Sequence, residues 1–145
     1  MLRFAGQAAL SAPADFEAVL LVARAQAALG RADEAEKTFV RLRAMVDGSP
    51  RIYDRLYALA CVSAGRDLEK ALACAEADLA LRQDAGAYHT LALVLGKLGK
   101  HDQARFAIET ARSIDPRDPA IRKAADELLA GKSGGARATA EKAAR

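Results

Sequence analysis

Tryptophan and asparagine are missing from the 145-residue sequence, and aromatic residues make up only 5% of it. Residues branched at the β-carbon are also scarce, because valine, isoleucine and threonine together number 14. Strands favour β-branched and aromatic side chains, so this composition nearly excludes a protein built on sheets. The sequence holds instead 36 alanines and 18 leucines, which are among the strongest helix formers. We therefore predict an all-α fold.

Long apolar runs and cysteine frameworks are lacking as well. No stretch of about 18 apolar residues occurs, so we expect no transmembrane helix and no membrane partner. The apolar N-terminal run is interrupted at Gly6 and Gln7, too early for the core of a secretory signal. Cys61 and Cys74 fit neither a disulfide framework nor a metal-binding spacing, which indicates two buried thiols in a reducing compartment. The expected localisation is cytoplasmic.

The formal net charge of +3 comes from the C-terminal end of the chain. Residues 131–145 carry four basic residues and one acidic residue, whereas the two kinds are equal in number over the remaining positions. The body is therefore neutral, without the basic surface of a nucleic-acid-binding protein. We expect no nucleic-acid partner, and an RNA contact through the basic tail is the weaker alternative.

The sequence contains internal repeats. Gly30, Gly65 and Gly99 are spaced 35 and 34 residues apart, and each follows a helical apolar run. A small residue follows each glycine at the expected contact between two helices: Ala35, Ala71 and Ala104. Self-similarity at this period is typical of helical repeat arrays.

Apolar residues inside each repeat follow the period of a helix. In the third repeat one face holds Tyr88, Leu91, Ala92 and Leu95, and the facing stripe on the next helix holds Ala104, Ile108 and Ala111. In the first repeat the predicted stripes hold Val19, Val22, Ala23 and Gln26, then Ala35, Phe39 and Leu42. These patterns predict pairs of helices packed through their stripes.

Acidic residues and prolines mark the expected helix starts. Asp67 and Asp102 are predicted to cap the second helices of their pairs. Ser49-Pro50, Asp115-Pro116 and Asp118-Pro119 each place a capping side chain before a proline, whose missing N–H costs nothing at the first helical position.

The third unit resembles a tetratricopeptide repeat. Its matching residues are Tyr88, Leu91, Ala92, Gly99, Ala104, Ile108, Ala111 and Pro116. The first unit matches at Gly30, Ala35 and Phe39, whereas the second departs most, with Asp78 at a stripe position. The resemblance implies a right-handed α-solenoid of antiparallel helix pairs.

We expect repeats at 14–50, 51–85 and 86–119 and a capping helix at 119–130 with a polar outer face. Residues 1–13 are expected to be a partial helix left from a preceding repeat, since Ala8 and Pro13 have the spacing of the closing alanine and proline of the third unit. Residues 131–145 are expected to be a disordered basic tail.

No arrangement of residues predicts catalysis. The Ala-Gly-Lys-Ser sequence at 130–133 resembles the end of a phosphate-binding loop, but Asp126 stands where that motif requires glycine. His89 and His101 lie on different predicted helices without further ligands at a metal-binding spacing. We expect no catalytic residue, no metal, no cofactor and no enzymatic activity.

The first helices of stacked pairs line a concave surface in such arrays. The candidate ligand-binding residues on this surface are Arg24, Arg51, Arg55, His89 and Lys97, against Glu17 and Asp54. The excess of positive charge predicts an acidic peptide or a C-terminal carboxylate, which arginine binds with two hydrogen bonds. Some members of the resembled family hold such a carboxylate with lysine and asparagine, and the absence of asparagine means that this clamp is not reproduced.

Two other interpretations stay open. The same charges are typical of solubilising groups on an exposed helix face. The floor of the expected groove is small or apolar at Ala27, Ala28, Ala58, Leu93 and Gly96, which leaves room for a partner helix or extended segment, including one from a second copy of this chain. A protein-interaction scaffold that binds a peptide is the leading hypothesis, and a self-assembling, homo-oligomeric repeat module is the alternative.

Overall fold

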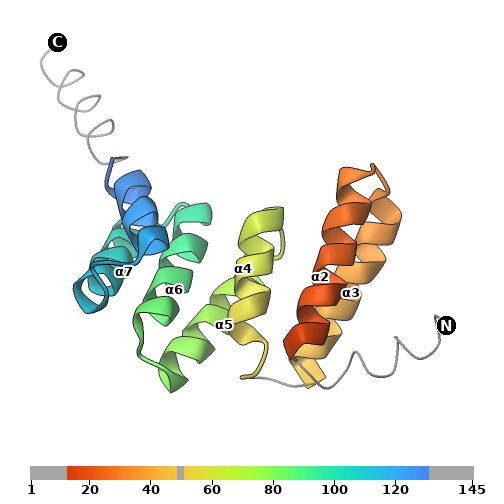
Figure 1. The fold of residues 1–145 in the computed structure, drawn as a ribbon, viewed down its shortest axis with the longest axis horizontal. Helices are drawn as coiled ribbons and strands as arrows, with labels where there is room; N and C mark the ends of the chain where they lie inside the picture. Colours follow the sequence, from red (N-terminus) through yellow and green to blue (C-terminus); the bar gives the residue numbers. More distant parts are fainter. Residues whose placement is uncertain (1–12, 49–50, 131–145) are drawn as a thin grey trace, which may run out of the picture.

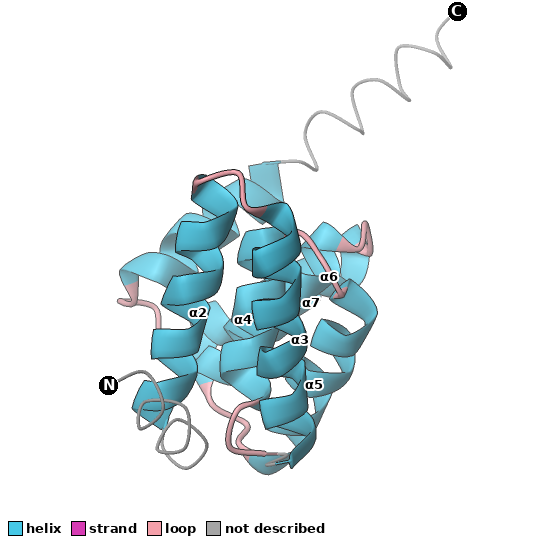
Figure 2. Cartoon of the chain, turned by 90° about the vertical axis from the view of Figure 1, so that its right-hand side faces the viewer, coloured by secondary structure: helices cyan, strands magenta, loops and turns pink. Residues whose placement is uncertain are grey.

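The computed structural model describes residues 13–48 and 51–130. The helices of these residues are α2 (Pro13–Ala28), α3 (Ala32–Gly48), α4 (Asp54–Ala64), α5 (Leu68–Leu81), α6 (Ala85–Lys97) and α7 (His101–Ile114). Residues 119–130 are also helical. The described residues contain no strand (Figure 2), which confirms the predicted all-α fold. Nearly all of the predicted N-terminal unit and the whole predicted tail lie outside the described residues, as does Ser49-Pro50.

The helices form hairpins that follow one another in a row (Figure 1). The first hairpin consists of α2 and α3, the second of α4 and α5, and the third of α6 and α7. Residues 119–130 pack on the third hairpin, where Ile121 and Ala125 join its buried core. Each hairpin therefore buries apolar side chains against its neighbours as well as within itself, which is the basis of a helical solenoid.

The turn inside each hairpin lies at one of the three repeated glycines. Gly30, Gly65 and Gly99 have φ angles of 75°, 66° and 77°, a left-handed conformation that side chains with a Cβ rarely adopt. The N–H of the following residue donates to the carbonyl five residues earlier in all three turns: Arg31 to Gln26, Arg66 to Cys61, and Lys100 to Leu95. This hydrogen bond ends the first helix in the same way each time, so equivalent residues can be counted back from each glycine.

The predicted caps Asp67 and Asp102 are wrong. Asp67 does stand at the N-terminal cap of α5, but its side chain makes no capping hydrogen bond there and instead accepts one from the Tyr57 hydroxyl. Asp102 lies inside the first turn of α7, which begins after Lys100, and it pairs with Arg105. A capping residue must precede the helix, and the position of the glycine turn fixes where each helix begins.

Two other acidic residues do cap helices. The Asp118 carboxylate accepts hydrogen bonds from the N–H groups of Ala120 at 2.8 Å and Ile121 at 3.2 Å, as its place before Pro119 predicts. Asp84 caps α6 by accepting from the Ala87 N–H at 2.8 Å. Both carboxylates satisfy backbone donors that have no partner inside the helix.

Aromatic contacts join the first two hairpins. The rings of Phe16 and Tyr53 stack with centroids 5.2 Å apart, and those of Phe39 and Tyr57 are 5.9 Å apart. One predicted residue lies elsewhere, because Val22 is exposed instead of packing with its neighbours on α2. The buried stripe of α2 runs through Phe16, Val19 and Ala23, and Val22 lies about 100° around the helix from Ala23, outside this stripe. No helix of the described residues is long and apolar enough to cross a membrane.

The buried stripe of α3 allows a direct test of the fold. Leu42 is fully buried, so Leu42→Ala should lower the free energy of unfolding by about 3 kcal/mol in urea denaturation, because the cavity is only partly refilled. Val40 lies on the exposed side of the same helix, and Val40→Ala should change the free energy of unfolding by less than about 0.5 kcal/mol. Equal losses in the two variants would contradict the assignment of the helix faces.

Candidate functional site

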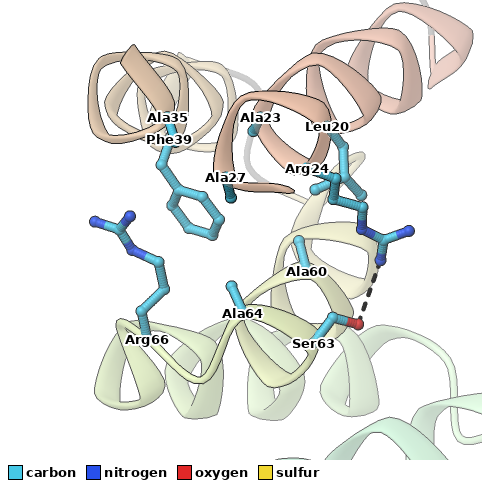
Figure 3. A pocket seen from close by; sticks show the side chains of 10 residues that line it. All are labelled: Leu20, Ala23, Arg24, Ala27, Ala35, Phe39, Ala60, Ser63, Ala64 and Arg66. Atoms are coloured by element: carbon cyan, nitrogen blue, oxygen red, sulfur yellow. Dashed lines mark hydrogen bonds between the residues drawn. The ribbon is translucent and has the colours of Figure 1, made fainter. Parts of the chain in front are cut away.

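A cleft of about 280 Å³ separates the first hairpin from the second (Figure 3). Its lining residues are Leu20, Ala23, Arg24, Ala27, Ala35, Phe39, Ala60, Ser63, Ala64 and Arg66. They come from α2 and α3 on one side and from α4 and the turn after it on the other. Contacts between α3 and α4 are sparse, whereas α5 packs closely on α6. The cleft therefore marks the looser of the two junctions between hairpins.

Small side chains form most of the cleft surface. Ala23 and Ala27 belong to α2, and Ala60 and Ala64 belong to α4. Methyl groups are too small to fill the space between two hairpins, so an apolar opening remains between the helices. Phe39 of α3 adds an aromatic ring to the lining. The result is a site that can accept an apolar group.

Two arginines reach the cleft from opposite sides (Figure 3). Arg24 is exposed and donates from its guanidinium to Ser63 Oγ at 3.3 Å. Arg66 holds its guanidinium carbon 4.4 Å from the centre of the Phe39 ring and forms an ion pair with Glu36. The charge of Arg66 is therefore compensated by a carboxylate. Within the described part of the chain, the side-chain partner of Arg24 is a neutral hydroxyl.

Arg55, a predicted ligand-binding residue, is held in an ion-pair cluster away from this cleft. Its Nε donates to Asp78 Oδ2 at 2.6 Å, and its second guanidinium nitrogen donates to Asp84 Oδ1 at 2.8 Å. Asp78 is almost fully buried, and Arg82 lies 3.8 Å from its other oxygen. Because these carboxylates belong to α5 and to the cap of α6, Arg55 of α4 links three helices.

The electrostatics of this cluster favour the charged forms. Burial opposes the charge of Arg55, but hydrogen bonds with Asp78 and Asp84 outweigh it and raise the pKa of the guanidinium. Burial likewise opposes ionisation of Asp84, and its hydrogen bonds from Ala87 and Arg55 lower the pKa of that carboxyl. A Cβ at Gly86 would lie 2.7 Å from Arg55 Nη1, so a larger residue there would have to displace the guanidinium from its present position.

The other three predicted site residues also lie apart from the cleft. Arg51 precedes α4 with a φ of 81°, and its carbonyl accepts a hydrogen bond from the Arg82 guanidinium. His89 is half-buried on α6, and Lys97 is exposed at the end of that helix. Burial lowers the pKa of His89, and the charge of Asp118 partly opposes this shift. Arg24 is thus the one predicted site residue that lines the cleft.

Arg66, Ser63 and Phe39 are site residues that the sequence did not single out for binding. Arg66 directly follows the turn glycine, and the other two repeats also have a basic residue at this position. This repeated basic residue is the sequence signal that could have predicted a long cationic side chain beside the junction between hairpins. Gly96, which was expected on an open groove floor, instead lies against Leu128 of the last described helix, 2.9 Å from where a Cβ would stand.

The cysteines offer no activated nucleophile. Burial raises the pKa of Cys61 to about 11 and that of Cys74 to about 12, so both thiols stay protonated near neutral pH. In the described residues, no three histidine, cysteine or acidic side chains are grouped as ligands for a metal ion. The cleft itself combines an apolar surface with a cationic group at its edge.

The buried ion pair predicts a large effect on stability. Asp78→Ala should lower the free energy of unfolding in urea by about 3 kcal/mol, because it leaves the half-buried Arg55 without its buried partner. Glu76 is exposed on the same helix, so Glu76→Ala should change the free energy of unfolding by less than about 0.5 kcal/mol. Similar stabilities of the two variants would show that the pair does not hold the helices together.

Burial of His89 predicts a pH-dependent loss of stability. Because the pKa of His89 is lowered in the fold, the unfolded chain takes up the proton at a higher pH than the folded chain does. The stabilising contribution of the neutral imidazole is therefore fully present above about pH 6.5, and it is lost as the pH falls through the folded-state pKa. His89→Gln should weaken the fall of the melting temperature between about pH 7 and 5. His101→Gln, at an exposed position, is the control. A profile of the His89 variant identical to that of the wild type would contradict this account.

Comparisons with known proteins agree with the repeat architecture. The family model described as tetratricopeptide repeat matches residues 85–118, which contain α6 and α7. The solved Arabidopsis OM64 TPR domain is 14% identical in sequence and superposes with a TM-score of 0.52 over 78% of this chain and 93% of that domain. A search of curated proteins finds no match. Residues 85–118 thus match the tetratricopeptide-repeat family model, and the structural likeness shows that the fold is a helical-repeat solenoid.

Proposed function

We propose that this chain binds a peptide segment of a partner protein, with an apolar side chain in the cleft and a carboxylate at Arg24. Tetratricopeptide repeats are in general protein-interaction modules. The observation that carries the proposal is the pairing of an open apolar cleft with an arginine whose side-chain partner, among the described residues, is the neutral Ser63.

The size of the cleft supports a side chain as its occupant. Pockets for small molecules usually measure about 300–1,000 Å³. The cleft, at about 280 Å³, lies near the lower limit of this range, a size that suits one or two side chains. Its alanine-rich surface can exclude water around an aliphatic or aromatic group, and burial of apolar surface supplies most of the affinity.

The charge at the edge supports an acidic neighbour for that side chain. A carboxylate beside Arg24 would replace a 3.3 Å hydrogen bond to a hydroxyl by a charge-assisted one. Arg66 is less available, because Glu36 already pairs with it. Arg55 is unavailable for the same reason, since Asp78 and Asp84 bind its guanidinium. Ligand contacts by Arg51, His89 and Lys97 remain predictions.

Selection from a random peptide library displayed on phage provides the test. Selected peptides should carry an aspartate or glutamate close to a leucine or aromatic residue. By fluorescence anisotropy, Arg24→Glu should weaken their binding about tenfold or more, corresponding to ~1.4 kcal/mol. Ala27→Leu should also weaken it, because the larger side chain occupies the cleft.

Two matched controls separate the cleft from general surface effects. Arg31→Glu reverses an exposed charge in the turn of the same hairpin, and Ala28→Leu enlarges an exposed residue that does not line the cleft. Both should bind the selected peptides as the wild type does. Failure to select any peptide, or equal affinities of the Arg24 and Arg31 variants, would overturn the proposal.

A further inference from the structure

The outer side of α2 is an apolar surface that no described helix covers. Leu21, Val22 and Leu29 are 64%, 50% and 69% exposed, although all three are large and apolar. Ala18 and Ala25 are also exposed and continue the same side of the helix. Figure 2 views the molecule from this end, with α2 and α3 in front. The hydrophobic surface of α2 is thus divided between two opposite faces.

Later hairpins bury the equivalent surface. Counted back from the turn glycines, Val22 is equivalent to Tyr57 of α4, which is fully buried and contacts Phe39 of the preceding helix. Ala25 is equivalent to Ala60, which is also buried. These positions of a first helix face the hairpin that comes before it. The exposed face of α2 is therefore a junction surface whose neighbour is not among the described residues.

The other end of the stack shows how such a surface is covered. Residues 119–130 bury Ile121, Ala124 and Ala125 against the third hairpin. The charged residues of this segment, Arg122, Lys123, Asp126 and Glu127, are all exposed. A single helix of 12 residues thus covers an apolar junction and presents a polar surface to water, as the end of a solenoid requires. The face of α2 has the opposite, apolar character.

We propose that residues 1–12 of this chain cover the outer face of α2, as α3 covers the equivalent face of α4. Residues 1–12 directly precede α2 in the sequence. In the same way α3 precedes α4 and α5 precedes α6, and each of these two helices packs on the helix that follows it. As a helix, twelve residues would extend ~18 Å, about three quarters of the length of α2. This occupant is part of the same molecule, so its effective concentration is far above that of a second copy in micromolar solution.

The sequence of this segment fits the role. Ala8 and Pro13 have the spacing of Ala111 and Pro116, which close the third hairpin. In this alignment the buried positions of α7, which are 104, 107, 108 and 111, correspond to positions 1, 4, 5 and 8. The residues at those positions are Met1, Phe4, Ala5 and Ala8. All four are apolar, as a segment that packs on α2 requires.

A cysteine pair tests the contact directly in the full-length chain. The alignment with α7 makes Ala5 equivalent to Ile108 and so to Phe39, and counting back from the turn glycines makes Val22 equivalent to Tyr57. The rings of Phe39 and Tyr57 are 5.9 Å apart. Ala5→Cys with Val22→Cys should form an intramolecular disulfide in a glutathione buffer at least tenfold faster than Ala5→Cys with Glu17→Cys. Glu17 lies on another exposed side of α2 and is closer to Ala5 in the sequence, so it is a strict control.

Each outcome has a distinct meaning. A fast disulfide within one chain, absent from the wild type with its buried Cys61 and Cys74, supports the proposal. Equal rates for the two pairs would overturn it. A disulfide that links two chains would also overturn it, because a second copy would then cover the face.

A stability measurement provides an independent check. Val22→Asp should lower the melting temperature by several degrees if residues 1–12 cover the side chain, since an uncompensated carboxylate would be buried. Val40→Asp makes the same change at an exposed residue of α3 and should have little effect. Equal melting temperatures for the two variants would contradict the proposed contact.

Discussion

The architecture depends on close contact between the two helices of each pair, which small side chains make possible. Ala35, Ala71 and Ala104 begin the buried stripe of each second helix, shortly after the left-handed glycine turn. With methyl groups at this contact, larger side chains such as Phe39 and Tyr57 pack at the junctions between hairpins. Stability therefore comes from contacts between neighbouring units in addition to those within each unit, as in other solenoids.

The two junctions between hairpins differ in how they are closed, and this difference locates the candidate site. At the second junction Arg55 joins α4 to Asp78 of α5 and Asp84 at the start of α6. At the first junction aromatic contacts hold the hairpins together, but alanines such as Ala27 and Ala64 leave a cleft beside them. The charge of Arg55 serves the fold, whereas Arg24 stands at the open junction and can serve a ligand.

Much of the fold could be predicted from the sequence because its signals are local. The glycine turns and the stripe of the third repeat depend on spacing along one or two helices, as Leu91 and Ile108 illustrate. Val22 was wrongly assigned, because α2 is apolar on both sides and its period alone does not show which side is buried. Asp67 was wrongly assigned as a capping side chain, because its carboxylate binds Tyr57 instead.

The candidate site was harder to predict because it depends on contacts between distant residues. Arg55 and its partners are 23 and 29 residues apart, and the unusual Asp78 at an otherwise apolar stripe position was the one signal of their pairing. The cleft arises from how two hairpins lie against each other, which helical periodicity does not encode. Arg24 was predicted because its position on the first helix follows from that period.

The central claim is that the first junction receives an acidic, apolar peptide segment. An NMR titration of the isotope-labelled chain with a selected peptide measures this at individual residues. The account predicts the largest shifts at the Arg24 side chain, the Ala27 and Ala64 methyl groups and the Phe39 ring, with α7 unaffected. Shifts concentrated on α6 and α7, with the signals of the cleft unchanged, would contradict it.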